Sequence, residues 1–404
     1  MIVATLVAAL GFLATAYITQ TRGLRIGGTI VVPTLAIYTL KYFIALPVFV
    51  LSTAFGYLFL GAVRDRTLLY GRDEFVAALV GGSLAPFVAY AILVAIAPEQ
   101  AISARPVVFL GSLLPGLAAY NIHQTKPAYR RQDILYATGL LVVLLGLGGL
   151  LISPRTAPLL GEAAPLVLFA ATADVAVARG AVVEGYLAPN VDARTTVIAL
   201  LTVGAVASEV VRRRFGVRLG VISLALLALF ALTTQWLLVL FVLAFVVCYA
   251  VVWLVHRRTL IYGRVLISTA CAIGVLVALG FTLAIPDATG LIFGERIPVL
   301  RGLSAIFVGV IAGVDAYSVH TTPPAERREQ AALAVATFVA LLVLARSVTE
   351  PFARGVLQEF GRTHVVVAAV VVIACLAVAA HYCIEKPSDE AVHSASVLSG
   401  GDGA

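Results

Sequence analysis

Hydrophobic residues in this chain gather into long apolar stretches, which short arginine-rich turns separate. Each stretch holds roughly 17–25 residues, enough for a helix to cross about 30 Å of hydrocarbon. We therefore predict two sets of six membrane-spanning helices, followed by one more. The first set lies near residues 2–20, 26–40, 43–63, 74–97, 106–122 and 133–152. The second set lies near residues 195–211, 217–234, 236–255, 265–285, 303–320 and 330–348, and the last helix near 364–383.

Short sequence blocks recur in the second set in the same order. Arg66–Arg72 returns as Arg258–Arg264, and Gly23–Gly27 returns as Gly216–Gly220. A third block, Gly116, Tyr120, His123, Pro127 and Arg130–Arg131, returns as Gly313, Tyr317, His320, Pro324 and Arg327–Arg328. Composition bias would not place charged residues and glycines in register, so we interpret the chain as a tandem duplication.

Composition supports a membrane protein. Hydrophobic residues make up 61% of the chain and charged residues only 12%, whereas a soluble domain carries about 25% charged residues. The chain is therefore predicted to be an all-α polytopic integral membrane protein. It would have about 12–13 transmembrane helices in two parallel repeats of about six.

The arginines predict the orientation. With the N-terminus outside, the inner loops and the start of the tail hold 18 of the 28 Lys and Arg residues, and both repeats show the same bias. We therefore predict a multi-pass protein of the cell membrane with a cytoplasmic C-terminus. The net charge of +7 follows from this bias, so it does not indicate a nucleic-acid partner.

These patterns divide the chain into five parts. Residues 1–152 are the first repeat, 195–348 the second, 349–386 an extra transmembrane helix, and 387–404 a disordered cytoplasmic tail. The connecting segment 153–194 contains an apolar run, 166–178, that Asp174 interrupts. We expect an interfacial or re-entrant segment there, and whether 166–178 crosses the membrane is left open.

The most specific motif is Tyr70-Gly71-Arg72 and its copy Tyr262-Gly263-Arg264. Glycine allows a tight turn at the end of a helix, and tyrosine places its hydroxyl among lipid headgroups. Arginine presents a fork of donors to a carboxylate or phosphate. The motif therefore indicates either an anchor on lipid phosphate or a site for an anionic substrate.

Two prolines interrupt apolar runs in the first repeat. Pro33 follows Gly27-Gly28, and Pro115 precedes Gly116. A helix broken at such a position exposes backbone N–H groups that favour an anion, whereas a simple packing kink is the alternative. The second repeat has Leu226 and Ala312 in the regions of these prolines.

Asp315 replaces Ala118 within an apolar run of the second repeat. A carboxylate at membrane depth is costly, so it suggests a role in permeation or proton coupling. His123 and His320 occupy matching positions, where interfacial hydrogen bonding is expected.

Enzymatic signatures are missing from the sequence. It contains no Walker-A loop, dinucleotide-binding glycine pattern, zinc-type cluster or Gly-x-Ser-x-Gly elbow. We therefore predict no catalytic site, cofactor or metal of its own, and an ATP-driven reaction would need a partner chain.

The first repeat resembles the PgsC/CapC membrane subunit of poly-γ-glutamate synthase. The resemblance rests on three blocks: Gly23 with Val31–Pro33, Leu69–Arg72 with Phe75–Ala78, and Leu114–Ala118. By this resemblance the family-motif positions are Pro33, Tyr70, Gly71, Arg72, Pro115 and Gly116. It implies a non-catalytic membrane subunit that assembles with an ATP-dependent amide ligase and other synthase components on a polyanionic polymer.

The function expected from sequence is therefore a membrane subunit of a poly-γ-glutamate synthase and export complex. Its basic loops would dock the ligase and attract the polymer; they contain Arg64, Arg66, Arg130, Arg131, Arg258 and Arg264. The alternative is a stand-alone transporter of small organic anions. Because the first repeat keeps the family motifs, we expect Arg72→Ala to reduce polymer output more than Arg264→Ala.

Overall fold

The computed structural model describes residues 2–67, 72–96, 113–153, 173–180, 194–217, 219–293, 303–349 and 355–384. Within these residues the regular structure consists of helices, with no β-strand. This result confirms the predicted all-α class.

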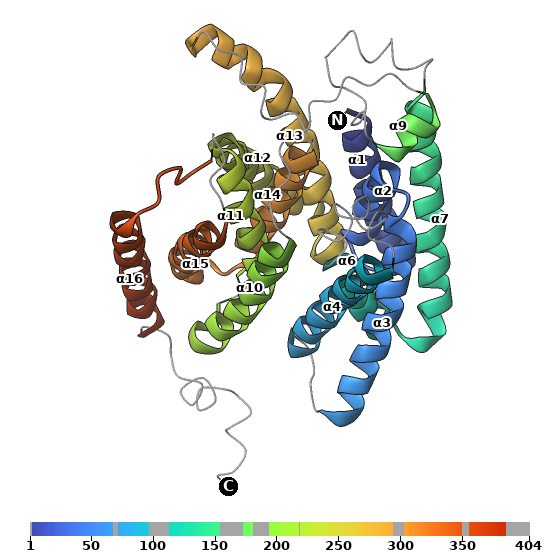
Figure 1. Ribbon diagram of the computed structural model, residues 1–404, viewed down its shortest axis with the longest axis horizontal. Helices are drawn as coiled ribbons and strands as arrows, with labels where there is room; N and C mark the ends of the chain where they lie inside the picture. Colours follow the sequence, from blue (N-terminus) through green and yellow to red (C-terminus); the bar gives the residue numbers. More distant parts are fainter. Residues whose placement is uncertain are drawn as a thin grey trace.

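The helices of the first half follow the expected order (Figure 1). They are α1 (Ile2–Arg22), α2 (Val31–Lys41), α3 (Ala45–Arg66), α4 (Arg72–Ile96), α6 (Leu113–Gln124), α7 (Pro127–Leu151) and the short α9 (Asp174–Ala178). Those of the second half are α10 (Arg194–Phe215), α11 (Val221–Thr233), α12 (Gln235–Thr259), α13 (Gly263–Phe293), α14 (Leu303–Thr321), α15 (Arg327–Val348) and α16 (Arg362–Ile384). A 3-10 turn, Pro324–Glu326, precedes α15.

Eight described helices are long and apolar enough to cross a membrane. They are α1, α3, α7, α12, Gly263–Ala284 of α13, Ser304–Thr321 of α14, α15 with its 3-10 turn, and α16. Such helices are what a multi-pass membrane protein requires. The total of 12–13 spans stays a prediction.

Two helices are shorter than the sequence pattern suggested. α2 has 11 residues and α11 has 13, so each is about 16–20 Å long and covers only part of a ~30 Å hydrocarbon core. A loop, Gly23–Ile30, stands where the first of these spans was expected to begin. Pro33 lies in the first turn of α2, where a missing N–H leaves no helical hydrogen bond unmade. Pro115 likewise lies in the first turn of α6.

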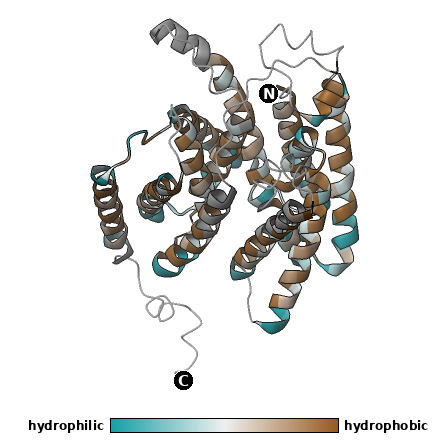
Figure 2. Cartoon of the chain, in the orientation of Figure 1, coloured by the Kyte–Doolittle hydropathy of each residue, from teal (hydrophilic) through white to brown (hydrophobic). Residues whose placement is uncertain are grey.

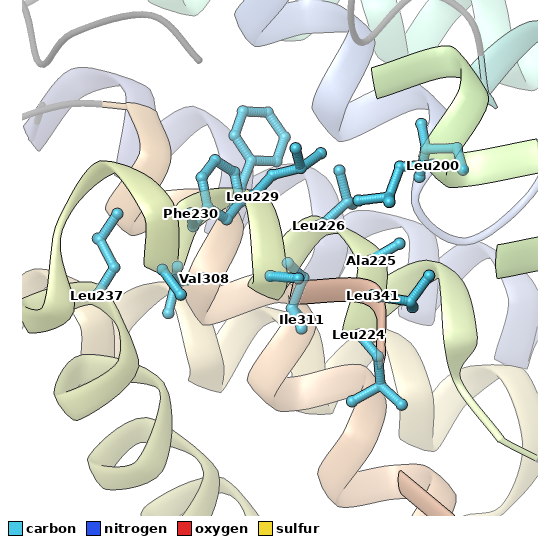
Figure 3. Close-up of a cluster of buried hydrophobic side chains, with 14 of the residues drawn as sticks. Leu200, Leu224, Ala225, Leu226, Leu229, Phe230, Leu237, Val308, Ile311 and Leu341 are labelled. Atoms are coloured by element: carbon cyan, nitrogen blue, oxygen red, sulfur yellow. The ribbon is translucent and has the colours of Figure 1, made fainter. Parts of the chain in front are cut away.

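The short helix α11 fills the centre of the second half. Its side chains point to α10, α12, α14 and α15 in the close-up of Figure 3. Ala225 and Leu229 are completely buried, as expected for a helix that is apolar on every face. The same core reaches α2 of the first half, where the Tyr38 ring stacks on Phe307 at 5.6 Å between centroids.

The two halves are packed together through α1 and α13, which lie side by side in Figure 1. The buried Ser268 hydroxyl donates a hydrogen bond to the Phe12 carbonyl at 2.9 Å. The corresponding pair, α10 and α4, also meets, and there Arg213 forms an ion pair with Asp73 at 3.3 Å. Equivalent helices of the two halves therefore make reciprocal contacts.

Glycines allow a close helix crossing at the same place in each half. A methyl group added to Gly116 of α6 would lie 2.5 Å from the Ala78 carbonyl of α4. One added to Gly313 of α14 would lie 2.5 Å from the Ala270 carbonyl of α13. Small residues let helix backbones approach closely in membranes. The matching contacts show that the sequence repeat is also a repeat of packing.

Only part of the connecting segment belongs to the described residues. Asp174 accepts a hydrogen bond from the Phe43 N–H at 2.7 Å, and Arg179 Nε donates to the Gly149 carbonyl at 2.8 Å. These contacts hold α9 against the turn between α2 and α3 and against the C-terminal end of α7. Residues 154–172 and 181–193 lie outside the described residues, as do 385–404, so the membrane crossing of 166–178 stays open.

Candidate functional site

Hydrophilic residues gather at one end of the bundle, as the lower ends of α3, α4, α7 and α10 show in Figure 2. We call this the basic end; here α1, α3, α10 and α12 finish, and α4, α7, α13 and α15 begin. Arg66, Arg131 and Arg258 are exposed there. The turn between α6 and α7 and the turn between α14 and α15 both lie at this end.

The first of these turns is held by one arginine. Arg130 donates from Nε to the Thr125 carbonyl at 3.0 Å, and from Nη2 to the His123 carbonyl at 3.4 Å. Its Nη1 donates to the Tyr57 hydroxyl on α3 at 3.2 Å. The guanidinium therefore satisfies carbonyl groups at the C-terminal end of α6, which have no partner within the helix. We call this arrangement the arginine clamp.

The second half contains the same clamp. Arg327 donates to the Thr322 carbonyl at 3.1 Å and the His320 carbonyl at 3.3 Å. It also donates to the Tyr249 hydroxyl at 3.2 Å. The sequence comparison found the arginine and histidine of each clamp but missed Tyr57 and Tyr249. The signal was present, because these tyrosines are 192 residues apart, the same offset as Arg66 and Arg258.

The surroundings of the two clamps differ in charge. In the first half, His123 Nε2 lies 2.9 Å from the Tyr57 carbonyl, and Arg64 pairs with Glu74 at 3.5 Å. In the second half, His256 takes the position of Arg64, and its Nδ1 lies 2.6 Å from His320 Nε2. An ion pair of the first half is thus replaced by a pair of imidazoles.

A buried carboxylate fixes the loop between α1 and α2. Asp133 of α7 accepts backbone hydrogen bonds from Arg25 at 2.6 Å, Ile26 at 2.8 Å and Gly27 at 3.2 Å. Asp133 is only 1% exposed, and these donors supply the polar contacts that a buried carboxylate needs. Because Asp133 is the seventh residue of α7, the loop lies about 9 Å inward from the start of that helix.

The copied Tyr-Gly-Arg motif makes a turn that aims its arginine between the halves. Gly263 has a φ of 64°, a value that glycine adopts without strain. Tyr262 before it is 79% exposed, whereas Arg264 after it is half-buried. The Arg264 guanidinium is within electrostatic range of Arg25 and Asp133 of the first half. Arg264, expected from sequence in a basic loop, therefore lies in the first turn of α13 and is half-buried.

Arg264 belongs to a group of polar side chains at the junction of the halves. We call this the junction cluster; its members are Arg25, Glu74, Tyr120, Asp133 and Arg264. Tyr120 is within electrostatic range of Glu74 and of both arginines. Three members of the cluster come from the repeated sequence blocks, one from each block. Arg25 and Tyr120 belong to the first half, and Arg264 belongs to the second.

Asp315 has local partners that sequence analysis did not identify. The Ser223 hydroxyl forms a hydrogen bond with its carboxylate, and a methyl group added to Gly220 would lie 2.7 Å from Asp315 Oδ1. In the first half the matching places hold Ile30, which is half-buried against an apolar cluster, and Ala118, which is buried in the apolar core. Asp315 thus lies against the loop before α11, much as Asp133 holds the loop before α2.

Some predicted site residues fall outside this description. Tyr70 and Gly71 lie outside the described residues, as does the side chain of Arg72. Pro115 and Gly116 are buried in the crossing of α4 and α6, distinct from the junction cluster. Among the described residues, no group of three or more His, Cys, Asp or Glu side chains could hold a metal ion.

The fold and the site define a polytopic helical membrane protein whose two halves repeat the same contacts. The profile of the family described as capsule biosynthesis CapC matches residues 10–131 and again residues 203–328. These segments cover more than half of the chain, so the protein belongs to the CapC family and carries its domain as a tandem duplication. This match places the protein in capsule polymer biosynthesis. A comparison with curated proteins gave no match, and neither did a comparison with solved structures.

Proposed function

We propose that this protein is the membrane subunit of a poly-γ-glutamate synthase and export complex. It docks an ATP-dependent amide ligase at its basic end and helps the polyanionic product to leave the cell. The observation that carries the proposal is the match of the capsule biosynthesis CapC family to both halves of the chain.

The charge distribution supports a docking and guiding role. Arg66, Arg131 and Arg258 are exposed at the basic end, and the positive-inside rule places that end in the cytoplasm, where ATP is available. A positive surface attracts a polycarboxylate and speeds its encounter with the protein. The ligase supplies the bond-forming chemistry, because the sequence lacks a nucleotide-binding motif.

The docking role predicts that exposed arginines retain the ligase. We expect Arg66→Gln, Arg131→Gln and Arg258→Gln each to lower the ligase that co-purifies with the tagged protein by about two- to fivefold, since exposed ion pairs contribute about 0.2–1 kcal/mol. In the triple variant the co-purified ligase should fall about tenfold or more. Added salt should also lower the ligase recovered with the wild-type protein, because salt screens exposed charges. The measurement is quantitative blotting of ligase from membranes of the native host.

Arg362→Gln is the control, because Arg362 is exposed at the start of α16, toward the other end of the bundle. It should leave ligase recovery unchanged. Equal recovery from the triple variant and from wild type would rule out docking through these arginines.

A further inference from the structure

The acidic members of the junction cluster are already engaged. Asp133 accepts three backbone hydrogen bonds from Arg25, Ile26 and Gly27. Glu74 pairs with Arg64 and accepts a hydrogen bond from Gln124 at 2.9 Å. Neither carboxylate forms an ion pair within 4.0 Å with Arg25 or Arg264 in the described part of the chain. Among the described residues, the two arginines therefore lie within electrostatic range of each other without a direct ion pair to either carboxylate.

Helix packing holds these arginines in place. α1 and α13 run antiparallel, so the C-terminal end of α1 lies beside the N-terminal end of α13. Ile267 of α13 packs against the apolar cluster that contains Leu24 and Ile26, the two neighbours of Arg25. The Ser268–Phe12 hydrogen bond crosses the same interface. Arg25 and Arg264 thus come from different repeats, lie beside a packed interface and are within electrostatic range of each other.

Arg264 has an unused donor in this position. Its Nη1 is buried and has no hydrogen-bond partner among the described residues, and nearby Arg25 opposes its positive charge. A buried donor without a partner costs about 1–3 kcal/mol, and more when the group is charged. An anion between the two guanidinium groups would satisfy the donor and reduce the repulsion.

We propose that Arg25 and Arg264 bind an oxyanion across the boundary between the two repeats. The fork of donors on each guanidinium suits a carboxylate or a phosphate. The carboxylate source is the nascent polymer, an identification that rests on the proposed function, and the phosphate source is an anionic lipid headgroup. Each repeat supplies one arginine, so the site is complete only when both repeats are present.

Direct binding to the full-length protein tests the proposal. The protein is placed in nanodiscs of phosphatidylcholine, and a fluorescent γ-linked hexamer of glutamate is titrated. We expect Arg25→Gln and Arg264→Gln to weaken binding about tenfold or more. Arg362→Gln, which removes an exposed arginine at the start of α16, should change it less than twofold. Arg264→Lys keeps the positive charge but lacks the guanidinium's fork of donors. It should weaken hexamer binding, but less than Arg264→Gln does.

A second arm distinguishes the source of the oxyanion. Protein from phosphatidylglycerol nanodiscs is analysed by native mass spectrometry for retained lipid. Hexamer binding that depends on Arg25 and Arg264 supports the polymer as source. Lipid retention that depends on both arginines, without such hexamer binding, supports the headgroup.

If Arg25→Gln and Arg264→Gln match Arg362→Gln in both arms, the proposal is overturned. Unfolding midpoints identify any variant that fails to fold. If Arg264→Gln fails to fold, the binding of Arg264→Lys is compared with that of the wild-type protein instead. Binding that persists although the host makes no γ-linked polymer would refute the proposed function and leave the oxyanion site standing.

Discussion

Gly274→Val should abolish the stable fold of the second half. A side chain at this position of α13 would collide with the Gly309 carbonyl group, and its Cβ would lie 3.3 Å from the Gly313 nitrogen. These are backbone atoms of α14 and cannot move without separating the two helices. We expect a cost of about 3 kcal/mol or more. The measurement is the yield of monodisperse protein in fluorescence-detected size-exclusion chromatography.

The matched control is Gly280→Val. Gly280 lies on the same helix, and a methyl group added there would meet nothing within 4 Å. Its variant should keep the wild-type yield, because valine replaces glycine in open space. Comparable yields from the two variants would show that the close crossing of α13 and α14 is not needed for stability.

Arg130→Met should lower the unfolding midpoint strongly, although the substituted side chain is of similar length. The change removes three hydrogen bonds of the first arginine clamp, including those to the His123 and Thr125 carbonyls. Hydrogen bonds to a charged group contribute about 1.5–3 kcal/mol each, and the orphaned carbonyls recover some solvation. We expect a net loss of about 2–4 kcal/mol, measured by thermal unfolding in detergent.

Arg131→Met provides the comparison, because Arg131 is the exposed neighbour of Arg130. It should shift the midpoint little. Arg327→Met should resemble Arg130→Met, since the second clamp has the same three contacts. If a clamp variant is as stable as Arg131→Met, the repeated clamp geometry contributes little to stability.

The repeat and the helical class could be predicted because their signals are local. Arginines and glycines stand out against an apolar background, so their register is visible without a structure. Helix length was less predictable for α2 and α11. Apolar residues buried by protein and apolar residues facing lipid look alike in sequence, so a short buried helix with its flanking loop resembles a full span.

The site depended on contacts that sequence does not display. The sequence pattern puts Arg264 in a basic loop, and only the packing of α1 on α13 shows that it lies within electrostatic range of Arg25. From sequence we expected Arg72→Ala to reduce polymer output more than Arg264→Ala. The proposed oxyanion site instead gives Arg264 a direct role in binding the polymer. Asp315 likewise gained its partner, Ser223, from a helix 92 positions earlier in the chain.

We propose that this duplicated CapC protein acts in the synthesis and export of γ-linked polyglutamate. The most direct measurement is secreted polymer from a native host that lacks the gene, with and without the wild-type chain restored. The polymer should disappear on deletion and return with the wild-type protein. Unchanged polymer in the deletion strain would contradict the claim and favour a transporter of small organic anions.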